Sequence, residues 1–328
     1  MDYRIIHQTK YIYLEPASLG YNEAHLTPRS FVRPLFSQQC LATQITVTPE
    51  WNDHRERVDF FGNQVLYFAI RQPHDQTTIT ATSLVRIEPV TYQTNLLTAV
   101  GDLLSTHATK HDHPAAQQTS FGQSNGRAAY ASPWEMIASQ LKSELNPETL
   151  DARQYILNSP LVAVFPELVD YAKPSFPPGR RIVEALYDLM QRIHHDFAFV
   201  PGATTISTPL SDVLKQRRGV CQDFAHLMLG CIRAQGLAAR YVSGYIETLP
   251  PPGKEKMVGS DASHAWCSVY LPQLGWLDFD PTNNLLPTEQ HITVAWGRDY
   301  VDVAPLKGVF FSNGRHKLFV SVDVARVI

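Results

Sequence analysis

The N-terminal part of the chain alternates apolar and polar residues in short runs, a pattern typical of β-strands. These runs are rich in β-branched and aromatic residues, and they cover residues 4–13, 41–47, 65–70 and 77–87. Proline and Gly-Asn turn signals separate them. Several short strands at this spacing predict a sandwich or a curled antiparallel sheet. We expect this β-rich domain to occupy residues 1–95.

The next stretch, residues 96–132, is polar and lacks an apolar period. It is predicted to be a polar linker or an excursion. Three histidines within it, His107, His111 and His113, could be interpreted as a metal cluster. No cysteine or glutamate nearby completes a coordination set, which favours a solvated loop. The sequence indicates no metal or cofactor elsewhere in the chain, and the role of this stretch stays open.

From Pro133 onward the apolar residues recur with the helical period of about 3.6. Helices are predicted over about 134–145, 148–157 and 180–195. The third has one apolar face, formed by Ile182, Ala185, Leu186, Leu189 and Ile193. A further amphipathic helix begins near Val220, and Gly236 follows it as a typical stop signal.

Beyond this helix the period becomes two, which predicts strands over 240–246, 265–271 and 276–280. Gly275 marks a hairpin turn between the last two of these strands. Residues 318–328 alternate apolar and polar side chains after an Asn-Gly hairpin signal, so we expect this strand to pair in a sheet. The whole pattern predicts an α+β protein whose second domain spans 133–328 and includes the C-terminal strands.

Composition narrows the class of protein. The 328 residues include 28 basic and 31 acidic side chains, for a net charge of -3. This balance provides neither a basic surface for nucleic acid nor a lysine cluster for anionic lipid. No run approaches the ~20 apolar residues that span a bilayer, and the polar N-terminus does not resemble a secretory signal. We therefore expect a soluble cytoplasmic protein with no nucleic-acid or membrane partner.

The four cysteines are widely spaced and form no Cys-x-x-Cys motif. Neither a disulfide framework nor a structural zinc site is expected from this pattern. Three of them are interpreted as small hydrophobic residues: Cys231 falls on an apolar helical stripe, Cys267 alternates away from His264, and Cys40 lies in a predicted strand.

Cys221 differs from the other three because it follows Gly219 at the start of the amphipathic helix. The macrodipole and the free backbone N–H groups at a helix N-terminus stabilise a thiolate. The same N–H groups can bind the oxyanion that forms when a thiolate attacks a carbonyl. The position therefore predicts a nucleophile, with a core cysteine as the alternative.

A thiolate nucleophile needs a base, and the base needs an orienting group. His264 lies on the first strand of the predicted hairpin, and Asp278 and Asp280 share one face of the second. The hairpin can therefore place a carboxylate beside the imidazole, where it fixes the tautomer and stabilises the imidazolium. Alternation does not choose between the two aspartates. Pro281 suits the end of the paired region, next to Asp280.

Together these motifs resemble the bacterial transglutaminase-like superfamily. The resemblance rests on residues 219–225, 239–245, 264–266, 275–276 and 280–282. It implies a papain-like core, in which a cysteine-bearing helix packs on an antiparallel sheet that carries histidine and aspartate. It also implies that Cys221 is the nucleophile, His264 the base and Asp280 the orienting carboxylate.

The resemblance extends to both ends of the chain. One bacterial branch has a β-rich N-terminal domain, and this chain resembles it at His7, Tyr11, Tyr13, 26–29 and 59–63. The chain also resembles the C-terminal segment of that branch, at 297–300, Asp302 and 305–308. Two features depart from the family pattern. Residues 99–130 match nothing in it, and the tryptophan that animal transglutaminases use as an oxyanion donor has no counterpart between Trp134 and Cys221. Gln222 and Gln216 are polar candidates for that donor.

Three functions fit these residues. The first is a cysteine hydrolase, a peptidase or amidase, that cleaves an amide bond of a peptide or protein through a thioester. The second is a protein-glutamine acyltransferase, in which an amine resolves the thioester; the triad is the same. The third is a catalytically silent binding module, against which the intact Cys-His-Asp set argues. No calcium-binding loop is suggested, and the oligomeric state is not indicated.

Substrate preference stays open at this stage. Arg217 and Arg218 precede the nucleophile and could favour an acidic substrate, or they could be solvated or paired with an aspartate. The proline- and glycine-rich segment 248–261 is predicted to form a surface loop at the rim of the cleft. It is either a flap that contacts substrate or an inert insertion.

Overall fold

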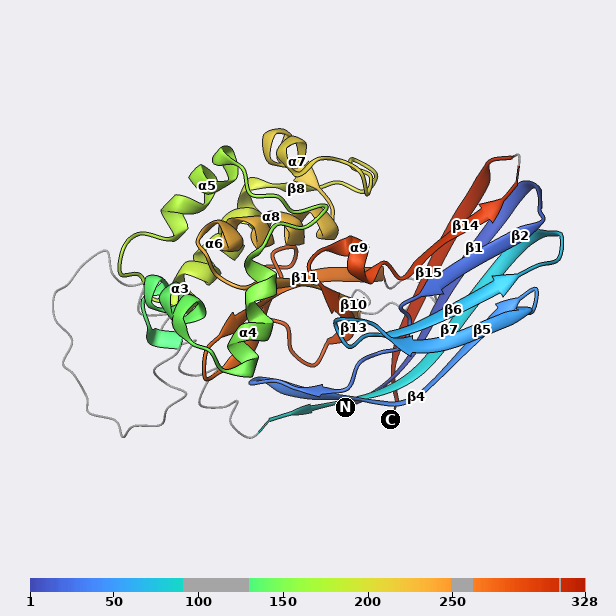
Figure 1. Ribbon diagram of the computed structural model, residues 1–328, viewed down its shortest axis with the longest axis horizontal. Coiled ribbons are helices and arrows are strands. Elements are labelled where there is room, and N and C mark those ends of the chain that lie inside the picture. Colours follow the sequence, from blue (N-terminus) through green and yellow to red (C-terminus); the bar gives the residue numbers. More distant parts are fainter. Residues whose placement is uncertain (91–129, 249–261, 313, 328) are drawn as a thin grey trace, which may run out of the picture.

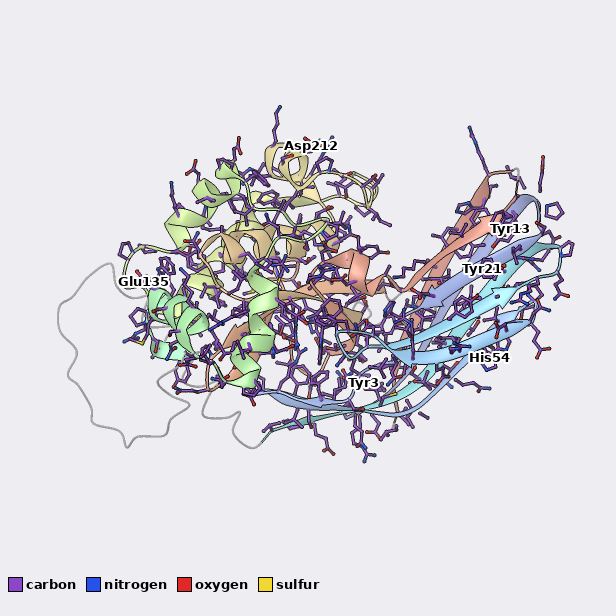
Figure 2. The ribbon with its side chains drawn as sticks, in the orientation of Figure 1. Tyr3, Tyr13, Tyr21, His54, Glu135 and Asp212 are labelled. Carbon is purple, nitrogen blue, oxygen red and sulfur yellow. The ribbon has the colours of Figure 1, made fainter. Side chains whose placement is uncertain are left out.

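The computed structural model describes residues 1–90, 130–248, 262–312 and 314–327 (Figure 1). A long β-structured arm extends from one side of a body that combines helices with a sheet. Figure 2 shows Tyr13, Tyr21 and His54 on the arm, and Glu135 and Asp212 on helices of the body. Nearly all of the predicted linker, with its three histidines, and nearly all of the loop 248–261 lie outside the described residues.

Two antiparallel sheets form the arm, with strand orders β15-β1-β7-β4-β3 and β14-β2-β6-β5. Side chains along β1 alternate between buried and exposed positions, because successive residues of a strand point to opposite faces. The predicted β-rich, sandwich-like domain is confirmed. Its strands are β1 (Asp2–Ala17), β2 (Leu19–Ala24), β3 (Phe31–Val32), β4 (Phe36–Thr48), β5 (Asp53–Val58), β6 (Gln64–Ile70) and β7 (His74–Pro89).

The last two strands of the chain also belong to the sheets of the arm. β15 (His316–Val327) pairs antiparallel with β1, from Asp2 opposite Val327 to Tyr13 opposite His316. β14 (Leu306–Phe311) pairs with β2. The expectation that the C-terminal strand pairs in a sheet is therefore confirmed. We expected these strands to belong to the second domain, residues 133–328, whereas they form their ladders with the N-terminal strands β1 and β2.

The body is built on a third antiparallel sheet with the order β12-β11-β10-β13. Its strands are β10 (Ala239–Ile246), β11 (Ala262–Leu271), β12 (Gly275–Phe279) and β13 (His291–Gly297). Two short strands, β8 (Ala198–Phe199) and β9 (Arg218–Gly219), pair in parallel with each other. The helices are α3 (Trp134–Ser143), α4 (Pro147–Arg153), α5 (Pro166–Ala172), α6 (Ile182–Asp196), α7 (Leu210–Gln216), α8 (Cys221–Ala234) and α9 (Tyr300–Val303), with 3-10 turns at Gln154–Ile156 and Lys173–Ser175.

Helix α8 lies at the centre of the body and packs on β10 and β11. Its residues from Asp223 to Arg233 are buried, and the Cys267 thiol of β11 lies 3.2 Å from the Ala225 carbonyl oxygen. The apolar face predicted for α6 is fully buried against the same core. A cysteine-bearing helix packed on an antiparallel sheet is the predicted α+β core. No helix within the described ranges combines the length and the apolar character that crossing a membrane requires.

Polar contacts fix the arm against the body. The Tyr245 hydroxyl of β10 lies 3.0 Å from His7 Nδ1 of β1, and Arg326 of β15 donates to Glu247 at 2.8 Å. The Gln38 side chain of β4 bonds both backbone groups of Thr293 in β13, at 2.7 and 2.8 Å. These contacts hold one end of the arm next to the strands that carry the candidate site.

Candidate active site

Cys221 is the first residue of α8 and is partly buried. The preceding Val220 is extended, and its backbone N–H donates to Asp223 Oδ2 at 2.8 Å. Asp223 also accepts a 2.6 Å bond from Thr204 Oγ1, so a carboxylate caps the helix start. A Cβ on Gly219 would lie 2.6 Å from Asp223 Oδ2, which explains the glycine before the nucleophile candidate.

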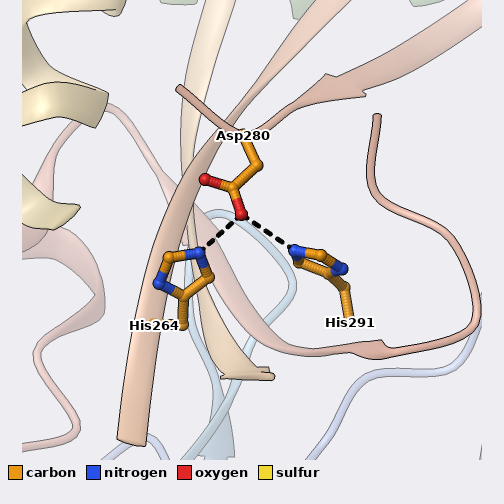
Figure 3. Close-up of side chains that lie close together, drawn as sticks. All are labelled: His264, Asp280 and His291. Carbon is orange, nitrogen blue, oxygen red and sulfur yellow. Dashed lines mark hydrogen bonds and ion pairs between the residues drawn. The ribbon is translucent and has the colours of Figure 1, made fainter. Parts of the chain in front are cut away.

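His264 and Asp280 meet as the predicted hairpin allows. His264 lies on β11 and Asp280 directly follows β12, and His264 Nε2 lies 2.7 Å from Asp280 Oδ2 (Figure 3). Cys221 and His264 line the same cavity, and the nearby thiol is one of the causes that raise the pKa of the imidazole. Because Nε2 faces the carboxylate, Nδ1 is the nitrogen available to the thiol. The structure therefore brings the three predicted site residues together: His264 contacts Asp280 and shares a cavity wall with Cys221.

The electrostatics of this pair favour the charged imidazole. Burial lowers the pKa of His264, but the charge and hydrogen bond of Asp280, followed by the contact with Cys221, outweigh it and raise the pKa to about 10. Burial raises the pKa of Asp280, and the two imidazoles of His264 and His291 reverse that effect and hold its pKa well below the usual range. The pair is thus an imidazolium and a carboxylate at neutral pH.

Asp280 is fully buried, and hydrogen bonds surround both of its oxygens. Besides His264, Oδ2 accepts from His291 Nε2 at 3.0 Å and from Asn283 Nδ2 at 2.7 Å. Oδ1 accepts the backbone N–H groups of Thr282 at 2.9 Å and Asn283 at 3.1 Å. Sequence analysis did not identify His291 or Asn283. A run of β-branched residues marks strand β13, but no spacing rule connects its first residue with Asp280.

Asp278 has different partners. One of its oxygens, Oδ2, forms a short ion pair with Arg33 of the arm and accepts the Trp266 indole N–H at 3.1 Å. The two aspartates that alternation could not distinguish therefore occupy separate networks. Asp280 lies beside the candidate base, and Asp278 neutralises a buried arginine.

A cavity of about 260 Å³ opens beside the thiol. The body contributes Cys221, Gln222, Tyr241 and His264 to its wall, and the arm contributes mainly apolar residues, among them Tyr11, Leu306, Leu318 and Val320. Burial raises the pKa of Tyr241 well above its usual value, with the Cys221 charge as the next cause, so its hydroxyl stays protonated. Gln222 lines this cavity, whereas Gln216 does not and accepts from Arg218 at 3.2 Å.

The remaining candidates lie away from the cavity. Cys231 and Cys267 are fully buried, and burial raises the pKa of both thiols. Cys40 lies in β4 beside Thr43, in the arm. Neither Arg217 nor Arg218 is among the described residues that line the cavity.

His264, Asp280 and His291 also have ligand atoms within 4.8 Å of one another, a spacing compatible with a metal ion. The Nε2 atoms of His264 and His291 both point at Oδ2 of Asp280, at hydrogen-bond distance (Figure 3). A cation between them would displace these two bonds and the bond from Asn283. The donor set therefore fits a hydrogen-bonded carboxylate better than a coordination site.

Comparison with known proteins agrees with this architecture. Residues 3–86 match the bacterial transglutaminase-like N-terminal region, and residues 172–281 match the transglutaminase-like superfamily. An uncharacterised protein of Mycobacterium bovis is 40% identical over 98% of this chain and 92% of its own length. A protein-glutamine gamma-glutamyltransferase of Pseudomonas aeruginosa is 36% identical over 42% of this chain and 22% of its own.

The fold has a counterpart among solved structures. A protein of Cytophaga hutchinsonii, described as a candidate cysteine protease, superposes with a TM-score of 0.68 at 19% identity, covering 99% of this chain and 90% of that one. The sequence matches extend over both the arm and the body, and the likeness in structure covers the same regions. The chain belongs to the bacterial branch of the transglutaminase-like superfamily, with the N-terminal region of that branch and its papain-like core.

Proposed function

We propose that the protein is a cysteine hydrolase that cleaves a peptide or other amide bond through a thioester. Cys221 is the nucleophile, His264 the base and acid, and Asp280 the orienting carboxylate. The observation that carries this proposal is the buried 2.7 Å contact between His264 and Asp280, next to a cavity that His264 lines together with the Cys221 thiol at a helix start.

The reaction follows from these contacts. The Cys221 thiolate attacks the carbonyl carbon, and the resulting oxyanion accepts hydrogen bonds at the N-terminus of α8. The His264 imidazolium gives its proton to the leaving amine when the C–N bond breaks. His264 then takes a proton from water as the water attacks the thioester, and collapse of that intermediate releases the acid and restores the thiolate.

Two side chains are suited to assist the backbone N–H groups as oxyanion donors. Gln222 and Tyr241 both line the cavity beside the thiol. Burial keeps the Tyr241 hydroxyl protonated by raising its pKa, so it can donate a hydrogen bond to substrate. Asp280 keeps the imidazole in one orientation, and His291 and Asn283 act as positioning residues through that carboxylate.

The arm takes part in substrate binding in this proposal. We propose that the N-terminal strands β1–β7 and the C-terminal strands β14 and β15 form one unit, of which Leu318 and Val320 on β15 form part of the cavity wall facing the catalytic body. Because these walls are apolar, the site suits an apolar side chain next to the scissile bond.

The main alternative is acyl transfer to an amine, the activity named for the Pseudomonas aeruginosa relative. The chemistry up to the thioester is identical for both activities. An acyltransferase has to attract a cationic amine, and no carboxylate is found among the described residues that line the cavity. The lining that the structure describes therefore offers no acidic group to attract an amine, which supports water as the acceptor.

Cys221 is predicted to be the cysteine that iodoacetamide alkylates first. It lies at a helix start beside an imidazolium, whereas Cys231 and Cys267 are fully buried. Peptide mapping by mass spectrometry after brief labelling at pH 6.5 should find the label on Cys221, with the partly exposed Cys40 of the arm as the internal reference. Equally fast labelling of Cys231 or Cys267 would show that the nucleophile is misassigned.

Asp280→Asn is predicted to lower turnover by up to about 10⁴-fold, the loss seen for the corresponding change in a serine triad. The amide no longer stabilises the imidazolium, and burial then lowers the pKa of His264. Asp278→Asn is the matched control. It should mainly lower the melting temperature, because Arg33 stays buried without its carboxylate. Turnover per folded molecule, with circular dichroism for folding, distinguishes the two variants. A folded Asp280→Asn enzyme with near-normal turnover would contradict the assignment.

A panel of peptidyl amides that includes glutamine peptides tests the reaction type. We expect the free acid as the main product even with a primary amine in millimolar excess, and no product from Cys221→Ala. Mass spectrometry of the products separates the outcomes. A transamidated product that dominates would establish acyl transfer, and the lack of any Cys221-dependent product would favour the silent module.

A further inference from the structure

A column of alternating tryptophan rings and guanidinium groups lies where the arm covers the sheet of the body. The guanidinium carbon of Arg240 is 3.9 Å from the ring centroid of Trp276 and 3.7 Å from that of Trp296. Arg29 of the arm also stacks on Trp296, at 3.5 Å. Arginine stacks readily on aromatic faces, and such stacking leaves the edge of the guanidinium, with its N–H donors, free for other partners.

These buried charges are not balanced. Arg33 and Arg240 are 6% and 4% exposed, and Asp278 pairs with Arg33. The guanidinium of Arg240 donates no hydrogen bond to any residue that the structure describes, and its Nε is buried without a partner. Nε and Nη2 of Arg33 are also buried without partners. Burying a cation is costly in free energy unless the cation is paired and hydrogen-bonded. One more negative charge would therefore stabilise this cluster.

Both arginines line a cavity of about 550 Å³, a volume typical of small-molecule sites. Its remaining wall is mainly aromatic, formed by Phe31, Phe60, Phe61, Tyr155, Trp276 and Trp296. One carboxylate, Asp151, is exposed and also lines the cavity. No lining residue is shared with the cavity beside Cys221, so the two sites are separate.

We propose that this second cavity binds a small organic anion. A carboxylate or phosphate group accepts hydrogen bonds from Arg240 and Arg33, whose planar forks match two oxygens of such a group. The apolar or aromatic part of the ligand packs against the phenylalanine and tryptophan rings. The arm supplies Arg33 and Phe31, and the body supplies Arg240 and Trp276, so the ligand bridges both parts of the fold.

Thermal unfolding with three probes tests the site: phenyl phosphate, phenylacetate and inorganic phosphate, each compared with sodium chloride at equal ionic strength. We expect at least one aromatic anion to raise the melting temperature in a saturable manner and inorganic phosphate to bind more weakly, since it leaves the aromatic wall unfilled. If each of the three probes changes the melting temperature no more than sodium chloride does at equal ionic strength, the proposal is overturned. Inorganic phosphate binding as tightly as the aromatic anions overturns the organic character of the ligand.

Arg240→Met removes the charge while filling the space between the rings. It should weaken binding of the aromatic anion by roughly tenfold to a hundredfold, the loss expected for one charge-assisted hydrogen bond. Arg217→Met is the matched control, because Arg217 stacks on Tyr171 and Phe197 but is 45% exposed and pairs with Asp196. Its affinity for the anion should match that of the unaltered protein. If the Arg240→Met variant binds the aromatic anion as tightly as the unaltered protein does, the anion binds elsewhere and the proposed site is wrong.

Phe60→Ala keeps the test decisive if Arg240→Met does not fold. Phe60 lines the cavity and is 82% exposed, so its truncation leaves the core intact. The variant should lose affinity for phenyl phosphate and keep its affinity for inorganic phosphate. Equal affinity of Phe60→Ala and the unaltered protein for phenyl phosphate would contradict the proposed aromatic wall.

Discussion

The candidate site depends on one buried carboxylate that stays ionised. Asp280 is fully buried, which by itself disfavours its charge. Two imidazoles, one amide and two backbone N–H groups donate to its oxygens, and these bonds offset the cost of burial. The carboxylate in turn keeps His264 protonated, and a protonated imidazole next to the thiol is what thiolate chemistry needs. Removing the charge of Asp280 would therefore undo the whole arrangement.

The same pair links stability to pH. The pKa of His264 in the folded protein lies above its ordinary value of 6.5, so its contribution is fully present below pH 6.5 and is lost as pH rises through about 10. The contribution of Asp280 to stability depends on pH in the opposite direction. Its pKa is depressed in the folded protein, so its contribution is present above its ordinary value of 3.8 and is lost as pH falls through the folded value. Both contributions to stability are therefore fully present between about pH 3.8 and pH 6.5, in the mildly acidic range.

Much of the fold was predictable because its signals are local. Helical periodicity marked α6 and α8, and alternation with a glycine turn marked β11 and β12. The surroundings of Asp280 were not predictable in this way. His291 reaches it from a strand held by Gln38 of the arm, through contacts far apart in the sequence. The pairing of β15 with β1 and the ion pair between Asp278 and Arg33 also join residues that are far apart in the sequence, so local patterns could not predict them.

The most direct test of this account is the protonation state of His264, followed by nitrogen NMR of histidine-labelled protein across pH. The account predicts an imidazolium with both ring nitrogens protonated through neutral pH, which loses its proton near pH 10. The His264 resonance can be assigned by its disappearance in His264→Gln, while the His291 signal serves as a buried reference in the same spectra. A His264 that titrates near its ordinary pKa of 6.5, or that stays neutral throughout, would contradict the central claim.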